Sequence, residues 1–349
     1  MKKKKKILVA PLDWGIGHAT RCIPIIRELI KENYEVILAA DDRPMHLLNI
    51  EFPKLEMIRF SGYKIKYPRY LPMSMSMLLQ SPKIILAIKK EHQVLQSIIL
   101  DYNIDGVISD NRFGLYSNKI PTVFITHQLE IQSYYLTNII QKLNYKYINR
   151  YKQCWIMDDY DLNLAGKLSK PKTLPNNTVY IGSQSRFIKT KKEKKYDYLA
   201  IVSGPEPQRS ILEKGLINCL KNSSKKSLIV LGKPEVNKDQ QIKNLTIKSH
   251  LDAKQLNNAI LQSELIICRP GYSTIMDLMK LEKKAILIPT PGQTEQEYLA
   301  KKFMQEDVFF SQHQNEFDFE KAVIESKHYK GFSAIKKQDT DWKKLFSLF

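Results

Sequence analysis

The chain has 349 residues, of which 43% are hydrophobic; this suits a globular protein of about two domains and excludes a disordered one. No run of 18 apolar residues occurs, which excludes a membrane-spanning helix. The net charge of +19 is compatible with anionic partners, but no nucleic-acid-binding motif accompanies the lysines, so we expect no nucleic-acid partner.

At the N-terminus, five lysines precede a short apolar run that ends near Pro11 and Asp13. This run is too short for a signal peptide, and we expect residues 7–10 to form the first strand. The cysteines are widely spaced and form no C-x-x-C pair: they are Cys22, Cys154, Cys219 and Cys268. This spacing is typical of free thiols in a reducing compartment and predicts a cytoplasmic protein without a cysteine metal site.

Short β-branched runs alternate with amphipathic stretches along the chain, a pattern typical of parallel α/β architecture. In the first half, strands are expected at 7–10, 35–39, 55–60, 106–109, 122–125, 153–157 and 178–181, with helices at about 18–32, 42–50, 82–101 and 131–150. In the second half, strands are expected at 198–202, 227–231, 245–248, 265–268, 285–288 and 308–310, with helices near 208–222, 252–263, 272–281, 295–305 and 317–326.

The polar segment 183–195 has the composition of a linker between two domains. We expect an N-terminal domain at 1–184 and a C-terminal domain at 185–334, with a short helix within about 335–349 packing back on the N-terminal domain. The predicted fold class is α/β, with two Rossmann-like doubly wound domains facing a cleft. Such sheets bind ligands at the carboxyl ends of their strands, so the residues after each strand are the candidates for a site.

The first candidate loop is Asp13-Trp14-Gly15-Ile16-Gly17-His18. Its glycines allow a close approach of the backbone to a ligand, and the helix start that follows favours negative charge. His18 is suited to proton transfer near neutral pH. A structural loop at the helix start is the alternative. The dinucleotide fingerprint G-x-G-x-x-G is incomplete, with Arg21 near its third glycine, which disfavours a NAD-dependent oxidoreductase.

Three loops of the second half also follow strands and begin helices: Val202–Arg209, Cys268–Asp277 and Ile288–Tyr298. In the second of them, Ser273 and Thr274 offer hydroxyls beside free backbone N–H groups, which suits a phosphate. Asp277, one turn further on, could bind both hydroxyls of a ribose. The alternative for this loop is a helix capped by Ser273 with Asp277 near its positive end. A plain capped helix start is likewise the alternative for the third loop.

In order, these loops resemble glycosyltransferases of the GT-B fold, in particular the lipid-linked N-acetylglucosaminyltransferase family of peptidoglycan synthesis and its bacterial relatives. The resemblance places Gly15, Gly17, Asn111 and His127 on the acceptor side. It assigns donor binding to Arg186, Ser203, Gly204, Arg269, Gly271, Ser273, Thr274, Asp277, Gln293, Gln296 and Glu297. The chain departs from the family pattern at Asp277 and Glu297 and in the loop Ser109–Phe113, which leaves the sugar and the acceptor open.

The resemblance implies transfer of a sugar from a nucleotide diphosphate donor to an acceptor hydroxyl, with inversion and without a metal or other cofactor. A UDP-linked donor such as UDP-N-acetylhexosamine is expected, with a glycan, a lipid-linked molecule or a small molecule as acceptor. The candidate base is His18, followed by Asp13 and Asp110. The alternatives are a UDP-sugar 2-epimerase or phosphorylase on the same fold and, less favoured, a basic nucleic-acid-binding protein.

Residues 62–90 interleave tyrosines and methionines with lysines and arginine, and no acidic residue lies between Glu56 and Glu91. One interpretation is peripheral contact with the anionic inner face of a membrane, where a lipid-linked acceptor or surface glycan would be reached. The other is a loop and helix packed on the core of the N-terminal domain, with solvated lysines.

Overall fold

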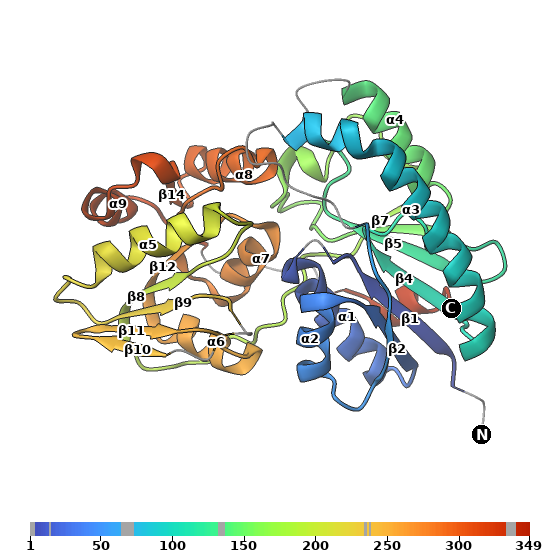
Figure 1. Cartoon of the computed structure of the whole chain (residues 1–349), viewed down its shortest axis with the longest axis horizontal. Helices are drawn as coiled ribbons and strands as arrows, with labels where there is room; N and C mark the ends of the chain where they lie inside the picture. Colours follow the sequence, from blue (N-terminus) through green and yellow to red (C-terminus); the bar gives the residue numbers. More distant parts are fainter. Residues whose placement is uncertain are drawn as a thin grey trace. The chain divides into compact units, whose positions relative to one another are not determined.

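The computed structural model describes residues 4–13, 15–63, 73–131, 137–233, 236, 239–332 and 340–349, with the backbone alone at 73–79, 81 and 137. The chain divides into two compact units (Figure 1). The first unit comprises Met1–Gln184 with Lys337–Phe349, and the second unit comprises Ser185–Lys336. Each unit contains one seven-stranded sheet, which confirms the predicted α/β class with two parallel-sheet domains.

The sheet of the first unit is built from parallel strands in the order β3-β2-β1-β4-β5-β6-β7. The strands are β1 (Lys6–Pro11), β2 (Glu35–Ala40), β3 (Glu56–Arg59), β4 (Gly106–Asp110), β5 (Thr122–Thr126), β6 (Gln153–Ile156) and β7 (Thr178–Tyr180). The strand order reverses between β1 and β4. In open α/β sheets, the crevice outside the carboxyl ends at such a reversal is where ligands bind.

The helices of the first unit are α1 (Ile16–Lys31), α2 (Asp42–Glu51), α3 (Met73–Tyr102), α4 (Thr137–Ile148) and α10 (Trp342–Phe346), together with the 3-10 turn Gly166–Leu168. Helix α1 starts after Gly15, whose φ of 147° lies in a region that favours glycine. The range 82–101 predicted for α3 was too short, because the helix continues through Pro82. A proline more often stands at the first turn of a helix than inside it.

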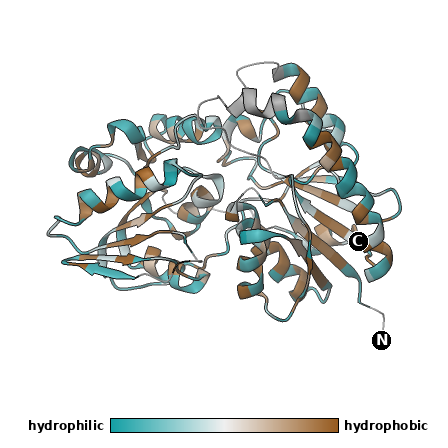
Figure 2. Cartoon of the chain, viewed as in Figure 1, coloured by the Kyte–Doolittle hydropathy of each residue, from teal (hydrophilic) through white to brown (hydrophobic). Residues whose placement is uncertain are grey.

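Both faces of the first sheet are buried, since successive residues along 7–10 of β1 and 36–40 of β2 point to opposite faces and are all buried. Figure 2 shows the strands of this sheet coloured as hydrophobic. In β1 the side chains of residues 7–10 are all fully buried, which confirms this run as a central strand. The ring of Phe346 in α10 lies 6.2 Å from that of Trp155, and Tyr34 donates a hydrogen bond of 2.9 Å to the Phe346 carbonyl. The C-terminal helix therefore packs on the first unit, as predicted.

The sheet of the second unit has the order β10-β11-β9-β8-β12-β13-β14, parallel except between β10 and β11. Its strands are β8 (Tyr196–Ile201), β9 (Ser227–Val230), β10 (Gln240–Ile242), β11 (Leu245–Lys248), β12 (Ser263–Cys268), β13 (Lys284–Leu287) and β14 (Phe310–Ser311). Its helices are α5 (Gln208–Leu220), α6 (Ala253–Leu261), α7 (Tyr272–Leu281), α8 (Thr294–Gln305) and α9 (Phe319–Ser326), with the 3-10 turn Gln314–Glu316. The order reverses between β8 and β12.

Strand β10 was not predicted, because its polar sequence Gln-Gln-Ile lies at the sheet edge and carries no apolar alternation. Within the part of the chain that the structure describes, no helix is long and apolar enough to cross a membrane.

Candidate functional site

The reversal point of the first sheet brings together two residues that are 92 positions apart in the sequence. His18 lies in the first turn of α1, directly after the loop that follows β1, and Asp110 is the last residue of β4. The Nδ1 atom of His18 lies 3.3 Å from Oδ1 of Asp110, and the carboxylate is fully buried. Two of the three predicted base candidates are therefore in contact.

Arg21, one turn along α1 from His18, lies between these groups and a second histidine. Its Nε donates to Asp110 Oδ2 at 2.6 Å, and its Nη2 donates to Asp110 Oδ1. Its Nη1 lies 2.8 Å from Nδ1 of His127, which directly follows β5, and its Nη2 lies 2.8 Å from Nδ1 of His18. Arg21 was not among the predicted site residues. Its spacing of three from His18 was the one signal that could have indicated it.

The charges of this cluster determine the ionisation of its members. Burial lowers the pKa of His18 below its ordinary value, and the positive charge of Arg21 lowers it further. Burial alone would raise the pKa of Asp110, but the charges of Arg21 and His18 and their hydrogen bonds lower it to about 2. Near pH 7 the cluster therefore contains a carboxylate and a guanidinium next to a neutral His18 imidazole.

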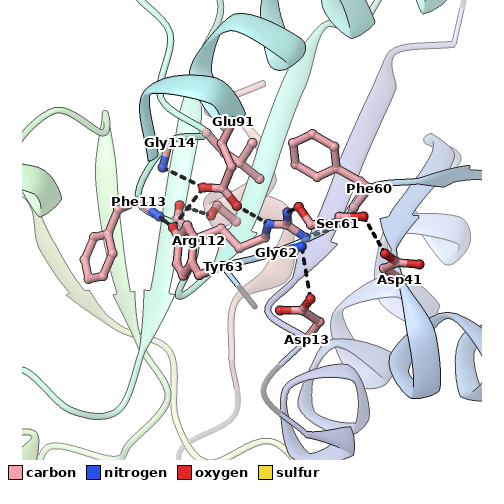
Figure 3. A network of polar contacts seen from close by, with 12 residues as sticks. Asp13, Asp41, Phe60, Ser61, Gly62, Tyr63, Glu91, Arg112, Phe113 and Gly114 are labelled. Atoms are coloured by element: carbon pink, nitrogen blue, oxygen red, sulfur yellow. Dashed lines mark hydrogen bonds and ion pairs between the residues drawn. The ribbon is translucent and has the colours of Figure 1, made fainter. Parts of the chain in front are cut away.

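Asp13, the remaining base candidate, contacts the loop after β3. Its Oδ2 accepts a hydrogen bond of 3.0 Å from the backbone N–H of Gly62 (Figure 3). A Cβ atom at Gly62 would lie 2.0 Å from Asp13 Oδ1, so this approach requires glycine. Oδ1 is buried, and no hydrogen-bond partner for it exists among the described residues.

A buried network around Arg112 holds this loop in place (Figure 3). The guanidinium of Arg112 is fully buried and donates to Glu91 at 2.8 Å and to the carbonyls of Phe60 and Ser61 at 3.0 and 2.8 Å. Glu91, on α3, also accepts from the hydroxyl of Tyr63 at 2.8 Å. Arg112 thus ties the loop after β3 to α3 and to the end of β4, next to Asp110.

The other predicted acceptor-side positions border the same sheet edge. Gly15 and Gly17 lie at the start of α1, and Asn111 follows Asp110 with a φ of 55° and donates its backbone N–H to the Ile125 carbonyl at 3.2 Å. Together with His127, they surround the end of β1, β4 and β5.

In the second unit, Arg269 lies under the loops at the reversal of the sheet. It is 1% exposed, and its Nη1 donates to the carbonyls of Ile288 and Pro289, both at 2.9 Å. Its Nη2 donates to the Gln208 carbonyl at 3.2 Å and to the side chain of Gln314. Burial lowers the pKa of Arg269 to about 10, so the group stays charged near neutral pH. The side chain holds the loops after β12 and β13 to the start of α5, a role that the sequence did not indicate.

Helix α7 starts with no side-chain cap, since its N-cap residue is Gly271. The interpretation of Ser273 as the cap was wrong, because the extended Gly271 directly precedes Tyr272 and places Ser273 and Thr274 inside the first turn. The carboxylate of Asp277, one turn further, accepts a hydrogen bond of 2.5 Å from the hydroxyl of Ser185. This contact brings the segment that contains Arg186 to α7.

The loop after β13 is braced by the helix that follows it. The side chain of Gln296 accepts from the backbone N–H of Thr290 at 2.9 Å, and that of Glu297 accepts from Gly292 at 2.8 Å. Thr290 Oγ1 and Gln293 Oε1 are buried and have no hydrogen-bond partner among the described residues.

Thr290 also lies close to the loop after β8, where Ser203 precedes Gly204. Its Oγ1 is 3.4 Å from the position of a Cβ atom on Gly204, whose φ of 111° favours glycine. Buried polar atoms without a partner are costly, so a ligand with hydrogen-bond donors would suit this edge.

The predictions of a metal-independent reaction and of contact with a membrane are among those that remain untested. Across the described ranges, no three His, Cys, Asp or Glu side chains are grouped so as to hold a metal ion. In the stretch considered for membrane contact, residues 64–72 and the side chains of 73–79 lie outside the described residues. The part of α3 that follows exposes Ile85 and Leu86 next to Lys83, Lys89 and Lys90.

Residues 209–344 match the family model of the glycosyltransferase family 28 C-terminal domain. This region contains Arg269, Asp277 and Gln296 of the second unit. No curated protein matches the chain by sequence.

Solved structures of similar fold include the calicheamicin glycosyltransferase CalG4, with 10% identity, 93% of this chain and 90% of that chain covered, and a TM-score of 0.63. MurG of Acinetobacter baumannii has 15% identity, 99% of both chains covered and a TM-score of 0.51. The glycosyltransferase SnogD from Streptomyces nogalater has 12% identity, 91% and 89% covered, and a TM-score of 0.57. At these identities the likeness shows the fold, and it confirms the resemblance to the GT-B fold predicted from the sequence.

Proposed function

We propose that the chain is a glycosyltransferase that transfers a sugar from a UDP-linked donor to an acceptor hydroxyl, with inversion and without a metal; the match of residues 209–344 to a glycosyltransferase domain and the GT-B fold support this. The observation that carries this proposal is the contact of His18 with the buried carboxylate of Asp110 at the reversal point of the first sheet. An imidazole beside a carboxylate is the usual arrangement of a general base.

In this proposal, His18 takes the proton of the acceptor hydroxyl while the acceptor oxygen attacks the anomeric carbon. The bond from that carbon to the diphosphate breaks on the opposite face, and the nucleoside diphosphate leaves with the electron pair. Asp110 stabilises the imidazolium that forms. Gly15 and Gly17 leave room for the acceptor, and Asp13 lines the same edge.

The donor is proposed to bind at the reversal point of the second sheet. The uncapped start of α7 directs backbone N–H groups and the hydroxyls of Ser273 and Thr274 at the diphosphate, with Arg186 adding positive charge. Asp277 binds the ribose hydroxyls. The unpartnered oxygens of Thr290 and Gln293 accept hydrogen bonds from the sugar hydroxyls.

We expect UDP to stabilise the wild-type protein and Asp277→Ala to lose most of this effect. A ligand at 100 times its Kd stabilises by about 2.7 kcal/mol. The variant loses hydrogen bonds to a charged group, worth about 1.5–3 kcal/mol each. Thermal unfolding with UDP, GDP or dTDP measures the stabilisation by each nucleotide. Calorimetric titration with UDP measures the affinity of the wild type and of Asp277→Ala.

The matched control is Ser185→Ala, which removes the hydroxyl bound to Asp277 but leaves the carboxylate in place. It should bind UDP like the wild type. Equal UDP affinity of Asp277→Ala and the wild type would refute the ribose role. Turnover of the UDP-sugar that depends on inorganic phosphate, or 2-epimerisation without an acceptor, would refute transfer to a hydroxyl.

For the acceptor, we propose a lipid-linked or surface glycan reached at an anionic membrane. The apolar and basic side chains of α3 near Ile85 and Leu86 support this, since basic groups near an anionic surface contribute about 1 kcal/mol each. We expect the protein to sediment with anionic vesicles at low salt and not with neutral ones. Replacing three lysines of α3 together by glutamine should weaken binding to the anionic vesicles; they are Lys83, Lys89 and Lys90.

The control is a triple variant of the second unit that loses the same amount of positive charge. In it, glutamine replaces three exposed lysines: Lys214, Lys225 and Lys254. This control should retain most of the binding. Equal losses in both triple variants would indicate attraction by net charge alone, and no sedimentation on anionic vesicles would point to an acceptor away from membranes.

A further inference from the structure

The contacts of Arg21 bear on where the protons of the two histidines lie. A guanidinium carries only hydrogen-bond donors. Its Nη2 and Nη1 each lie 2.8 Å from an Nδ1 atom, of His18 and of His127 respectively. At this distance each Nδ1 must accept the hydrogen bond, because an N–H on that nitrogen would face another N–H.

We propose that Arg21 is a positioning residue that sets the tautomer of both histidines, with Nδ1 of His18 and of His127 as acceptors and the ring proton of each on Nε2. In this neutral state neither atom of the 3.3 Å contact between His18 Nδ1 and Asp110 carries a proton, and the contact becomes a hydrogen bond only when Nδ1 of His18 is protonated. Arg21 and Asp110 therefore compete for the same nitrogen of His18.

This competition bears on the base role of His18, so the consequence for catalysis rests on the proposed function. To accept a proton at Nε2, the imidazole must carry its proton on Nδ1 and donate it to Asp110. The switch requires Nη2 of Arg21 to release His18, one proton to leave Nε2 for solvent, and one to arrive at Nδ1. Arg21 thereby keeps the base inactive until this contact is broken.

The surroundings of Arg21 explain how one contact can be released while the side chain stays in place. Arg21 is 3% exposed and remains bound through Nε and Nη2 to the buried Asp110 in either state. Its Nη1 remains bound to His127, which is 6% exposed. Among the described residues whose contacts are given above, the charged and titratable groups that meet here include Arg21, Asp110, His18 and His127, with the thiol of Cys22 3.8 Å from Asp110.

The direct test is the nitrogen NMR spectrum of the full-length protein labelled with ¹⁵N-histidine, recorded near pH 8. Signals are assigned by the loss of one pair in His18→Gln and another in His127→Gln. We expect both residues to show an unprotonated Nδ1 and a protonated Nε2. A protonated Nδ1 on His18 in the wild type would overturn the proposal, and this spectrum alone decides it.

Arg21→Lys tests the cause, because lysine keeps the charge beside Asp110 but lacks the planar fork. In this variant His18 should shift to the form with a protonated Nδ1. The matched control is Arg27→Lys on the same helix, where Arg27 pairs with Glu51 at 3.1 Å; it should leave the histidine spectrum unchanged. An Arg21→Lys spectrum identical to that of the wild type would show that Arg21 does not set the tautomer.

These outcomes are separate from those of the proposed function. If His18→Gln transfers sugar at the wild-type rate, His18 is not the base, yet the tautomer spectrum still tests the role of Arg21. If transfer needs His18 but Nδ1 is protonated in the wild type, the base role stands and the role of Arg21 is refuted.

Discussion

His18→Gln should lower the turnover number of sugar transfer by about 10²–10⁴-fold, the contribution that a general base makes. Donor binding should change little, since the predicted nucleotide site lies on strand ends of the other sheet. Because the pKa of His18 is lowered, its imidazole is already uncharged at neutral pH, and the wild-type rate should fall only as the pH drops below about 6.5, the ordinary value for histidine. Steady-state kinetics with saturating donor, together with calorimetric titration of the nucleotide, measure both quantities.

The control for this experiment is His46→Gln, which changes an exposed histidine of α2 and should leave the turnover number unchanged. Asp110→Asn should also be severe, because it removes the charge that stabilises an imidazolium on His18. A mild effect of His18→Gln with a severe effect of Asp13→Asn would assign the base to Asp13 instead.

Arg112→Met should destabilise the first unit by about 3–5 kcal/mol, the cost of leaving one partner of a buried ion pair uncompensated. The variant leaves the carboxylate of Glu91 buried without its guanidinium and removes the donors from the carbonyls of Phe60 and Ser61. All three tryptophans, including the buried Trp155, belong to the first unit. Denaturant unfolding followed by tryptophan fluorescence therefore reports this unit.

A double variant tests the cause of this loss of stability, and a substitution of an exposed arginine is its control. Adding Glu91→Gln to Arg112→Met should recover part of the loss, because the unpaired charge is then removed. Arg59→Met breaks an ion pair with Asp41 in which the arginine is 74% exposed, and it should shift the unfolding midpoint much less than Arg112→Met. If Arg112→Met and Arg59→Met unfold at the same denaturant concentration, the buried network does not stabilise the unit as argued.

Much of the fold was predictable because its signals are local. In parallel sheets covered on both faces, each strand is a short apolar run, and residues 7–10 and 265–268 illustrate this pattern. The turns that follow contain glycine or proline, so strand ends and helix starts were found within a few residues. The exceptions were β10, a polar edge strand, and α3, which runs through Pro82.

The candidate site was predictable only where its residues adjoin those turns. His18 stands in the first turn of a helix that follows a strand, and Asp277 lies one turn beyond such a helix start. The start of a helix marks a place for anions or reacting groups irrespective of the rest of the fold. The sequence alone therefore determined the order of strands and helices, the two-sheet architecture and the loops from which a site would be built.

The tertiary structure decided how the charged side chains are used. An arginine has the same sequence signature whether its donors bind a ligand or the protein, and Arg269 and Arg112 turned out to bind backbone carbonyls. Likewise, the contacts among His18, Arg21, Asp110 and His127 depend on the order β1-β4-β5 in the sheet, which brings residues about a hundred positions apart within hydrogen-bond distance. Periodicity encodes burial along one element, whereas the pairing of charges depends on which elements become neighbours.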